Sequence, residues 1–235
     1  FAALTSDQIG ALTAGQAANL TTAQIAAFTT EQITFLETAD LAALTAAQIV
    51  ALSSTNMAQL STAQIVALTA TQVTALTTAQ VAALDTAQLQ ALETADIKAL
   101  TGAQLAGLNT EQISSLTTTQ MAAIDTLDLR SLTNTQMAAL TTDQLLALGT
   151  PGIRAFTSAQ FQALTSDQLP SLSTTQVAAL DTSSIRAISA TEVAALGSDQ
   201  ITALTTAQML SFTTDQVAAL TSDQISAVEA TDLKG

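Results

Sequence analysis

The sequence predicts an all-α solenoid, a superhelix of consecutive short helices with one helix in each eight-residue repeat. Three observations support this fold class. An octad runs through the whole chain without insertion or deletion, each octad carries two apolar positions, and each carries one helix-capping signal. Positions are numbered below from Leu4, which is position 1 of the first complete octad, and the consensus is L-T-T-A-Q-I-A-A.

The apolar residues repeat with the period of the octad. Positions 1 and 6 are apolar in all 29 octads, and position 8 is almost always Ala, Ser or Gly. A continuous α-helix has about 3.6 residues per turn, so an eight-residue period would rotate these side chains around its surface. A coiled coil is therefore excluded, and the chain must break once in each repeat.

Position 2 predicts where each helix begins. It is Thr, Ser, Asp, Asn or Gly in 26 of 29 octads, and position 5 is Gln in 21 of 29. These are the residues of a capping box, and positions 1 and 6 stand where a hydrophobic staple pairs its side chains. We expect a helix of about six residues that restarts at every position 2. The alternative is a β-solenoid with positions 6 and 8 on one face, but Ala and Gln are poor strand formers.

A few octads depart from the consensus in the same way. All five basic residues occupy position 7, and position 5 of their octads is Asp, Gly or Ser in place of Gln. Several variant octads lie 56 residues apart, which is seven octads and predicts about 3.5 helices per superhelical turn. The candidate contact positions are Lys98, Arg130, Arg154, Arg186, Lys234, Asp96, Asp128 and Asp232.

Two interpretations of these positions remain open. They form lateral contacts or a recognition stripe, or each base pairs with the acid at position 2 or 5 of its own octad. A surface salt bridge of the second kind contributes only about 0–1 kcal/mol.

The composition argues against several functions. The net charge is −14 with five Lys and Arg in total, so we expect no nucleic-acid partner. The chain has no Cys and no His, and no apolar run approaches the length of a membrane span, so we expect no enzyme activity, no membrane insertion and no cofactor. Acids recur at position 4, as in Asp215 and Asp223, and carboxylates are ligands of calcium. They suit the positive end of a helix, and no Gly-rich loop gathers them.

The L-T-T-A-Q-[IV]-A-A-L octads resemble octapeptide-repeat tracts of large bacterial secreted or surface proteins of the adhesin-like kind. This resemblance implies an extracellular or cell-surface location in a bacterium. The chain lacks the Gly-Gly-x-Gly-x-Asp nonapeptides of calcium-binding secreted repeats, so the metal sites of that class are not expected here.

Residues 1–235 are interpreted as a single continuous array, a segment of a longer one, because the repeat is in register at both ends without a polar capping repeat. The predicted function is a non-enzymatic structural one: an extracellular stalk, surface layer or filament-forming subunit. The expected partners are other copies of the chain, end to end or side by side, or neighbouring domains. The alternative is a binding solenoid that recognises a peptide, glycan or host protein along its groove.

Overall fold

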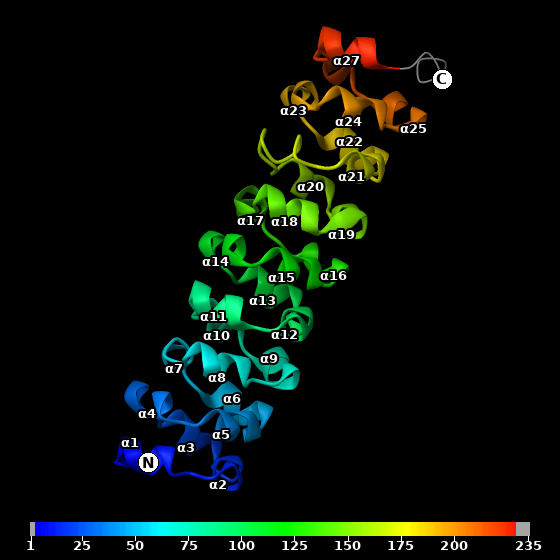
Figure 1. Ribbon diagram of the computed structural model, residues 1–235. Coiled ribbons are helices and arrows are strands. Elements are labelled where there is room, and N and C mark those ends of the chain that lie inside the picture. Colours follow the sequence, from blue (N-terminus) through cyan, green and yellow to red (C-terminus); the bar gives the residue numbers. More distant parts are fainter. Residues whose placement is uncertain (1–2, 229–235) are drawn as a thin grey trace. The chain divides into compact units, whose positions relative to one another are not determined.

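The computed structural model of the chain describes residues 3–228. Within this range it contains 27 helices of four to seven residues and no strand, which confirms the predicted helical solenoid and excludes the β-solenoid. The chain divides into two compact units, Phe1–Ile124 and Asp125–Gly235, and each is described by itself (Figure 1).

The helices of the first unit are α1 (Ser6–Gly10), α2 (Ala14–Ala18), α3 (Thr22–Ala26), α4 (Thr30–Thr34), α5 (Thr38–Ala43), α6 (Ala46–Ala51), α7 (Ser54–Met57), α8 (Thr62–Val66), α9 (Ala70–Ala75), α10 (Thr78–Ala82), α11 (Thr86–Ala91), α12 (Thr94–Ala99), α13 (Gly102–Ala106), α14 (Thr110–Ser115) and α15 (Thr118–Ala123). The helices of the second unit are α16 (Thr126–Leu129), α17 (Asn134–Ala139), α18 (Thr142–Ala147), α19 (Gly149–Ala155), α20 (Ser158–Phe161), α21 (Thr174–Ala178), α22 (Thr182–Ala187), α23 (Ala190–Ala195), α24 (Ser198–Thr202), α25 (Thr206–Leu210), α26 (Thr214–Ala218) and α27 (Ser222–Ala227).

Most helices begin directly after position 2, because the capping box predicted there is formed. At α6 the hydroxyl of Thr45 accepts the N–H of Gln48 at 3.3 Å, and the side chain of Gln48 accepts the N–H of Thr45 at 2.6 Å. The two residues before the helix, Leu44 and Thr45, are both extended, with ψ near 142° and 160°. Two extended residues turn the chain between α5 and α6.

One octad inside the described range forms no helix. Residues 166–171 form a turn, and position 7 of this octad is Pro170. Proline has no N–H to donate to the preceding turn of a helix, so the ladder cannot continue past it. The hydrogen bonds of the first turn persist, with the N–H groups of Gln168 and Leu169 donating to Thr165 O.

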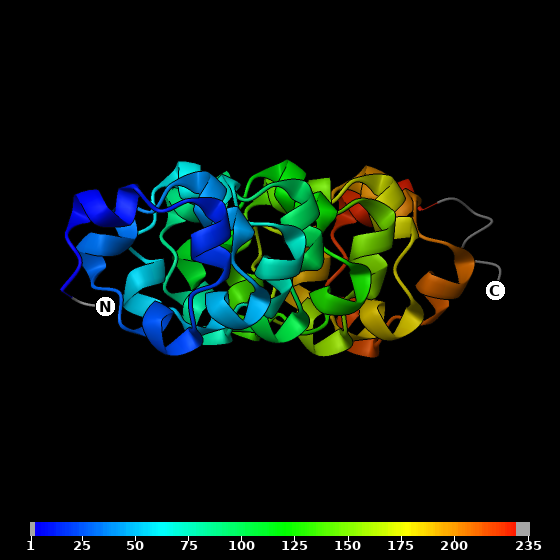
Figure 2. The ribbon, with the colours of Figure 1, turned by 90° about the horizontal axis from the view of Figure 1, so that it is seen from below.

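The core of each unit is the ladder of apolar side chains at positions 1 and 6. Position 6 is buried in every octad from Ile9 to Ile201, and position 1 is almost as well buried over most of this range. Helices three apart in the chain pack together, as α3 does with α6 and α6 with α9, so the chain returns over its own previous turn within each unit (Figures 1 and 2). Burying one such aliphatic side chain contributes about 1.5–3 kcal/mol, so each turn stabilises the next.

Candidate functional site

The side chain of Gln at position 5 does more than cap its own helix. Its amide group also donates to backbone carbonyls of the previous superhelical turn. Gln80 shows the full pattern: its Oε1 accepts the N–H of Thr77 at 2.9 Å, and its Nε2 donates to Ile49 O at 2.8 Å and to Leu52 O at 2.9 Å. We call this arrangement of one carboxamide and three backbone groups the glutamine clasp.

The clasp recurs with a constant offset in both units. Gln48, Gln72 and Gln88 of the first unit donate to carbonyls 28 and 31 residues earlier, and so do Gln160, Gln168, Gln208 and Gln216 of the second. An offset of 28 residues is 3.5 octads, in agreement with the turn predicted from the spacing of the variant octads. The carbonyls belong to position 6, at the C-terminal end of a helix, and to position 1 directly after it; the position 6 carbonyl, such as Ile49 O, also accepts the N–H of Leu52 at 3.1 Å.

The capping half of this interaction was predicted from the sequence, and the half between turns was not. A signal for it was present, because a capping box accepts Glu as well as Gln, yet position 5 is Gln 21 times and Glu only at Glu192. A carboxylate has no donor to offer a carbonyl. The strong preference for the amide therefore indicates an acceptor that the capping box does not contain.

Position 5 residues other than Gln form incomplete clasps. Asn56, one methylene shorter, donates from Nδ2 to Phe28 O at 3.0 Å, again 28 residues earlier. Asp40 is buried, and its Oδ2 has no hydrogen-bond partner. Burial and, to a smaller extent, the charge of Glu37 raise the pKa of Asp40 above its ordinary value.

Asp96 resembles Asp40. It is buried at the same position, its Oδ2 accepts the N–H of Glu93 at 3.1 Å, and burial raises the pKa of its carboxyl group. Both aspartates stand where most octads place a neutral donor, and as carboxylates they have none to offer.

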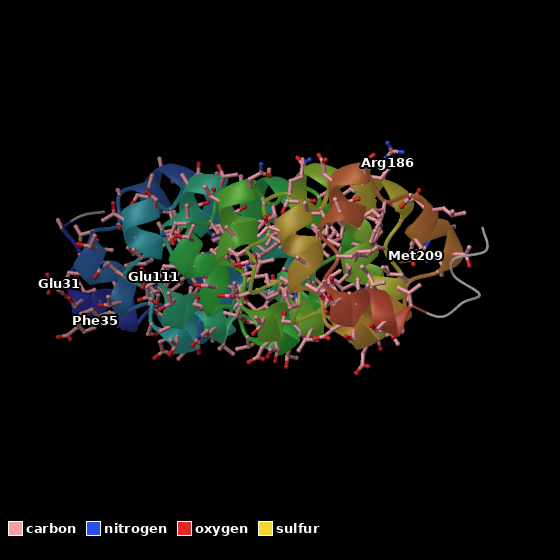
Figure 3. All side chains as sticks on the ribbon, turned by 90° about the horizontal axis from the view of Figure 1, so that it is seen from above. Glu31, Phe35, Glu111, Arg186 and Met209 are labelled. Atoms are coloured by element: carbon pink, nitrogen blue, oxygen red, sulfur yellow. The ribbon has the colours of Figure 1, made fainter. Side chains whose placement is uncertain are left out.

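The basic residues predicted as contact positions lie on helix surfaces at position 7. Lys98, Arg130, Arg154 and Arg186 are all exposed, and Arg186 projects outward from the ribbon (Figure 3). Arg130 Nε donates to Ala155 O at 3.1 Å, 25 residues later. Gln90 and Thr74, also at position 7, bond to the carbonyls of Ser115 and Ala99 with the same offset.

Side chains at position 7 thus bond to the next turn, whereas side chains at position 5 bond to the previous one.

Asp96 is buried and Asp128 is half-buried, whereas Lys234 and Asp232 lie outside the described residues. The lateral-contact and salt-bridge roles of these positions stay predictions.

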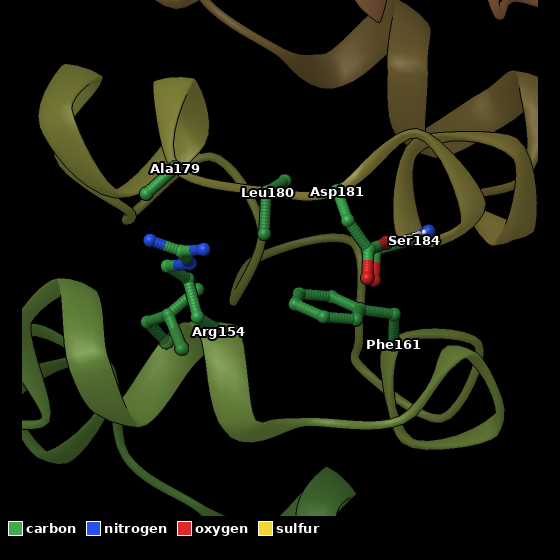
Figure 4. A pocket seen from close by; sticks show the side chains of 7 residues that line it. Arg154, Phe161, Ala179, Leu180, Asp181 and Ser184 are labelled. Atoms are coloured by element: carbon green, nitrogen blue, oxygen red, sulfur yellow. Dashed lines mark hydrogen bonds between the residues drawn. The ribbon is translucent and has the colours of Figure 1, made fainter.

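A cavity of about 90 Å³ lies in the second unit where position 5 is Ser184. It is lined by Ile153, Arg154, Phe161, Ala179, Leu180, Asp181 and Ser184 (Figure 4). The N–H of Ser184 donates to Asp181 Oδ1 at 2.6 Å. This hydrogen bond is the main cause that lowers the pKa of Asp181, against the smaller opposing effect of burial.

Residues 3–228 contain no group of three or more Asp, Glu, His or Cys side chains that could together hold a metal ion. In the same range no helix is long and apolar enough to cross a membrane.

Comparison with known proteins identifies the repeat. Among curated proteins, no sequence matches the chain. The family model described as the ALTTAQ repeat matches residues 33–70, 89–126, 121–153, 145–174 and 172–206. These matches cover more than half of the 235 residues. The chain therefore belongs to the ALTTAQ repeat family.

Proposed function

We propose that the chain is a non-enzymatic structural segment that supplies length: a stalk, surface layer or filament subunit of an extracellular, adhesin-like bacterial protein. The glutamine clasp carries this proposal, because it joins successive turns within each unit by the same recurring hydrogen bonds. A repeat of this kind adds length by adding turns and needs no new contact for each. The resemblance of the octads to tracts of bacterial surface proteins supports the location.

The first turn presents clasp donors on its outer face. Gln8, Gln16 and Gln24 cap their own helices through Oε1 at 2.8–2.9 Å. Gln8 and Gln16 are exposed and Gln24 is half-buried, whereas Gln at position 5 is buried from Gln32 onward.

The last described turn presents the complementary groups. Val217 and Ile225 at position 6 are 53% and 57% exposed, although position 6 is buried up to Ile201. They border an apolar hollow together with Met209, Leu220 and Val228. The carbonyls of these helices stand where the next turn would place its glutamines.

The register of the repeat supports a second copy of the chain as the occupant of this face. In this register Leu4 of the second copy takes position 1 of the octad that follows the one beginning at Val228. Its Gln8 then lies 28 and 31 residues beyond Phe212 and Met209, the offsets of the clasp. We propose end-to-end association of this heterologous kind, which propagates into fibres.

Light scattering and electron microscopy of the purified chain over a range of concentrations test the proposal. We expect elongated particles that lengthen with concentration. Val217→Asp with Ile225→Asp should abolish the association, because two buried carboxylates would face the partner's apolar side chains. Val66→Asp is the matched control, because Val66 is 47% exposed at position 7 on a helix surface. Particles that stay monomeric at every concentration would contradict end-to-end association.

The location is tested separately, by labelling intact cells of the source organism with antibodies to the chain. Labelling that appears only after the cells are opened would contradict an extracellular role.

The second candidate function is a binding solenoid, and the cavity beside Ser184 is the observation that favours it. A chain that stays monomeric while binding a ligand at this cavity would support the second candidate over the first.

A further inference from the structure

The octad of Ser184 lacks the side chain that closes the clasp. In clasped octads one carboxamide engages three backbone groups: the N–H of position 2 and the carbonyls 28 and 31 residues before position 5. For residue 184 these groups are the N–H of Asp181 and the carbonyls of Phe156 and Ile153. The hydroxyl of Ser184 is engaged with the carboxylate of Asp181.

The space of the missing side chain is open. Asp181, Ser184 and Ile153 all line the cavity, so residues that supply two of the three clasp groups border the same space. A single water needs only about 10–15 Å³ of such volume, whereas this cavity measures about 90 Å³ and accommodates several non-hydrogen atoms. The ring of Phe161 lies below Ser184 and Asp181, and the guanidinium of Arg154 lies beside Ala179 (Figure 4).

A comparison within the same unit shows that a small residue at position 5 does not by itself create this space. At Gly152 an added Cβ would meet the Cβ of Leu148 at 2.7 Å, so Leu148 already occupies the space that a side chain at 152 would enter. The space of the missing position 5 side chain is therefore open at Ser184 and filled at Gly152.

We infer that the cavity beside Ser184 is a binding site for a primary carboxamide, either a small free amide or the side chain of Gln or Asn on a partner polypeptide. A primary amide offers two N–H donors and one carbonyl acceptor, which match the carbonyls of Ile153 and Phe156 and the N–H of Asp181. The same three kinds of group hold the amide of Gln80 and Gln216 in their own octads.

The chemistry of the cavity discriminates against the isosteric carboxylate. A carboxylate has no donor for the two carbonyls, and it would face the charge of Asp181. The one feature that favours an anion is Arg154 at the rim. Acetamide and acetate therefore separate a carboxamide site from an anion site.

The experiment is a titration of the ¹⁵N-labelled full chain, followed by NMR, with acetamide, acetate and N,N-dimethylacetamide. Acetamide should give saturable shifts at the amides of Asp181, Arg154 and Thr157, which carry or adjoin the three clasp groups. Dimethylacetamide, which has no N–H, and acetate should give none there. Arg154→Ala should leave the acetamide response in place.

Ser184→Gln supplies the missing carboxamide within the chain. We expect it to abolish the acetamide response and to raise the melting temperature by about 2–4 °C. Thr182→Gln, at an exposed position of the same helix, should change neither. If Ser184→Gln does not fold, Ser184→Asn replaces it, because Asn56 already occupies position 5 in a folded octad; it should weaken the acetamide response at least several-fold.

A peptide with a single Gln, compared with the same peptide carrying Glu, distinguishes a partner's side chain from a free amide. Shifts with the Gln peptide alone assign the site to a polypeptide partner, and shifts with acetamide alone assign it to a small amide. An acetate response equal to that of acetamide would overturn the inference. An unchanged acetamide response in the Ser184 variants, or no saturable response to any amide, would do the same.

Discussion

Residues 60–91 and residues 148–195 are built from the same octad but differ at position 5. In the first stretch Gln64, Gln72, Gln80 and Gln88 each close a complete clasp. In the second stretch position 5 includes Gly152, Ser184 and Glu192, and the octad of Pro170 forms a turn in place of a helix. The apolar ladder is nevertheless continuous there, since Ile153, Ile185 and Val193 are at most 1% exposed.

The difference separates two roles. Apolar side chains at positions 1 and 6 hold the turns together in both stretches, so the superhelix survives the loss of single clasps. A buried amide needs the carbonyls of positions 1 and 6 of the previous turn, and an unsatisfied buried polar group is costly. A slide of one turn by part of an octad would separate the amide from these carbonyls. The clasp therefore fixes the phase of one turn against the previous one within the octad.

The largest expected effect comes from breaking a clasp in the regular stretch. Gln80→Leu keeps the volume but leaves the N–H of Thr77 and the carbonyls of Ile49 and Leu52 without this partner. At about 1 kcal/mol for each buried group, we expect a loss of about 3 kcal/mol in the free energy of unfolding, measured by urea denaturation. Gln8→Leu is the control, because exposed Gln8 makes only the capping bonds; we expect about 1 kcal/mol or less. Equal losses in the two variants would show that the bonds between turns contribute nothing.

Repairing the second stretch should give a somewhat smaller effect of opposite sign. Glu192→Gln keeps the bond from Ser189 N–H, which now ends on the carboxylate at 2.7 Å, and adds two donors. The carbonyls at the clasp offsets are those of Phe161 and Leu164. We expect a gain of about 1–2 kcal/mol in urea denaturation, and slower hydrogen exchange in α23. Glu111→Gln removes the same charge at an exposed position and should change stability by less than about 0.5 kcal/mol.

Gln80→Leu and Glu192→Gln both test a contact that was not predicted from the sequence. The octad, the cap and the apolar ladder were predicted, because they follow local rules that act within eight residues. The donation of Gln80 to Ile49 and Leu52 acts across a whole turn, and an approximate superhelical period does not identify its acceptors. The cavity at Ser184 could not be predicted either, because Gly152 is also a small residue at position 5 and the space beside it is filled by Leu148.

Acid should strengthen the incomplete clasps of Asp40 and Asp96. Their pKa values are raised in the folded chain above the ordinary 3.8, so the folded state binds protons first as the pH falls. The free energy of unfolding therefore rises as the pH falls from the pKa of the folded state toward 3.8. A protonated Asp can donate as Asn56 does, so Asp96→Asn should add about 1 kcal/mol at pH 7.

Denaturation at several pH values between 7 and 4 measures this effect. The double variant Asp40→Asn with Asp96→Asn should lose the gain on acidification. The lowered pKa of Asp181 acts in the opposite direction, because its contribution is lost as the pH falls below 3.8, so it does not mimic the effect between pH 7 and 4. A double variant that keeps the full acid gain would assign it to other carboxylates.

The smallest expected effect tests whether Pro170 weakens its turn. Pro170→Ala restores an N–H at position 7, which can donate to Ser166 O and convert residues 166–171 from a turn into a helix. The gain is offset because alanine frees the unfolded chain, and because Gln168 already closes its clasp on Met137 O and Leu140 O at 2.9 and 2.7 Å. We expect slower hydrogen exchange at the new amide and a stability change below about 1 kcal/mol. A loss above that size would show that the ring of Pro170 is itself needed for packing, and that residues 166–171 depend on the rigidity of the chain.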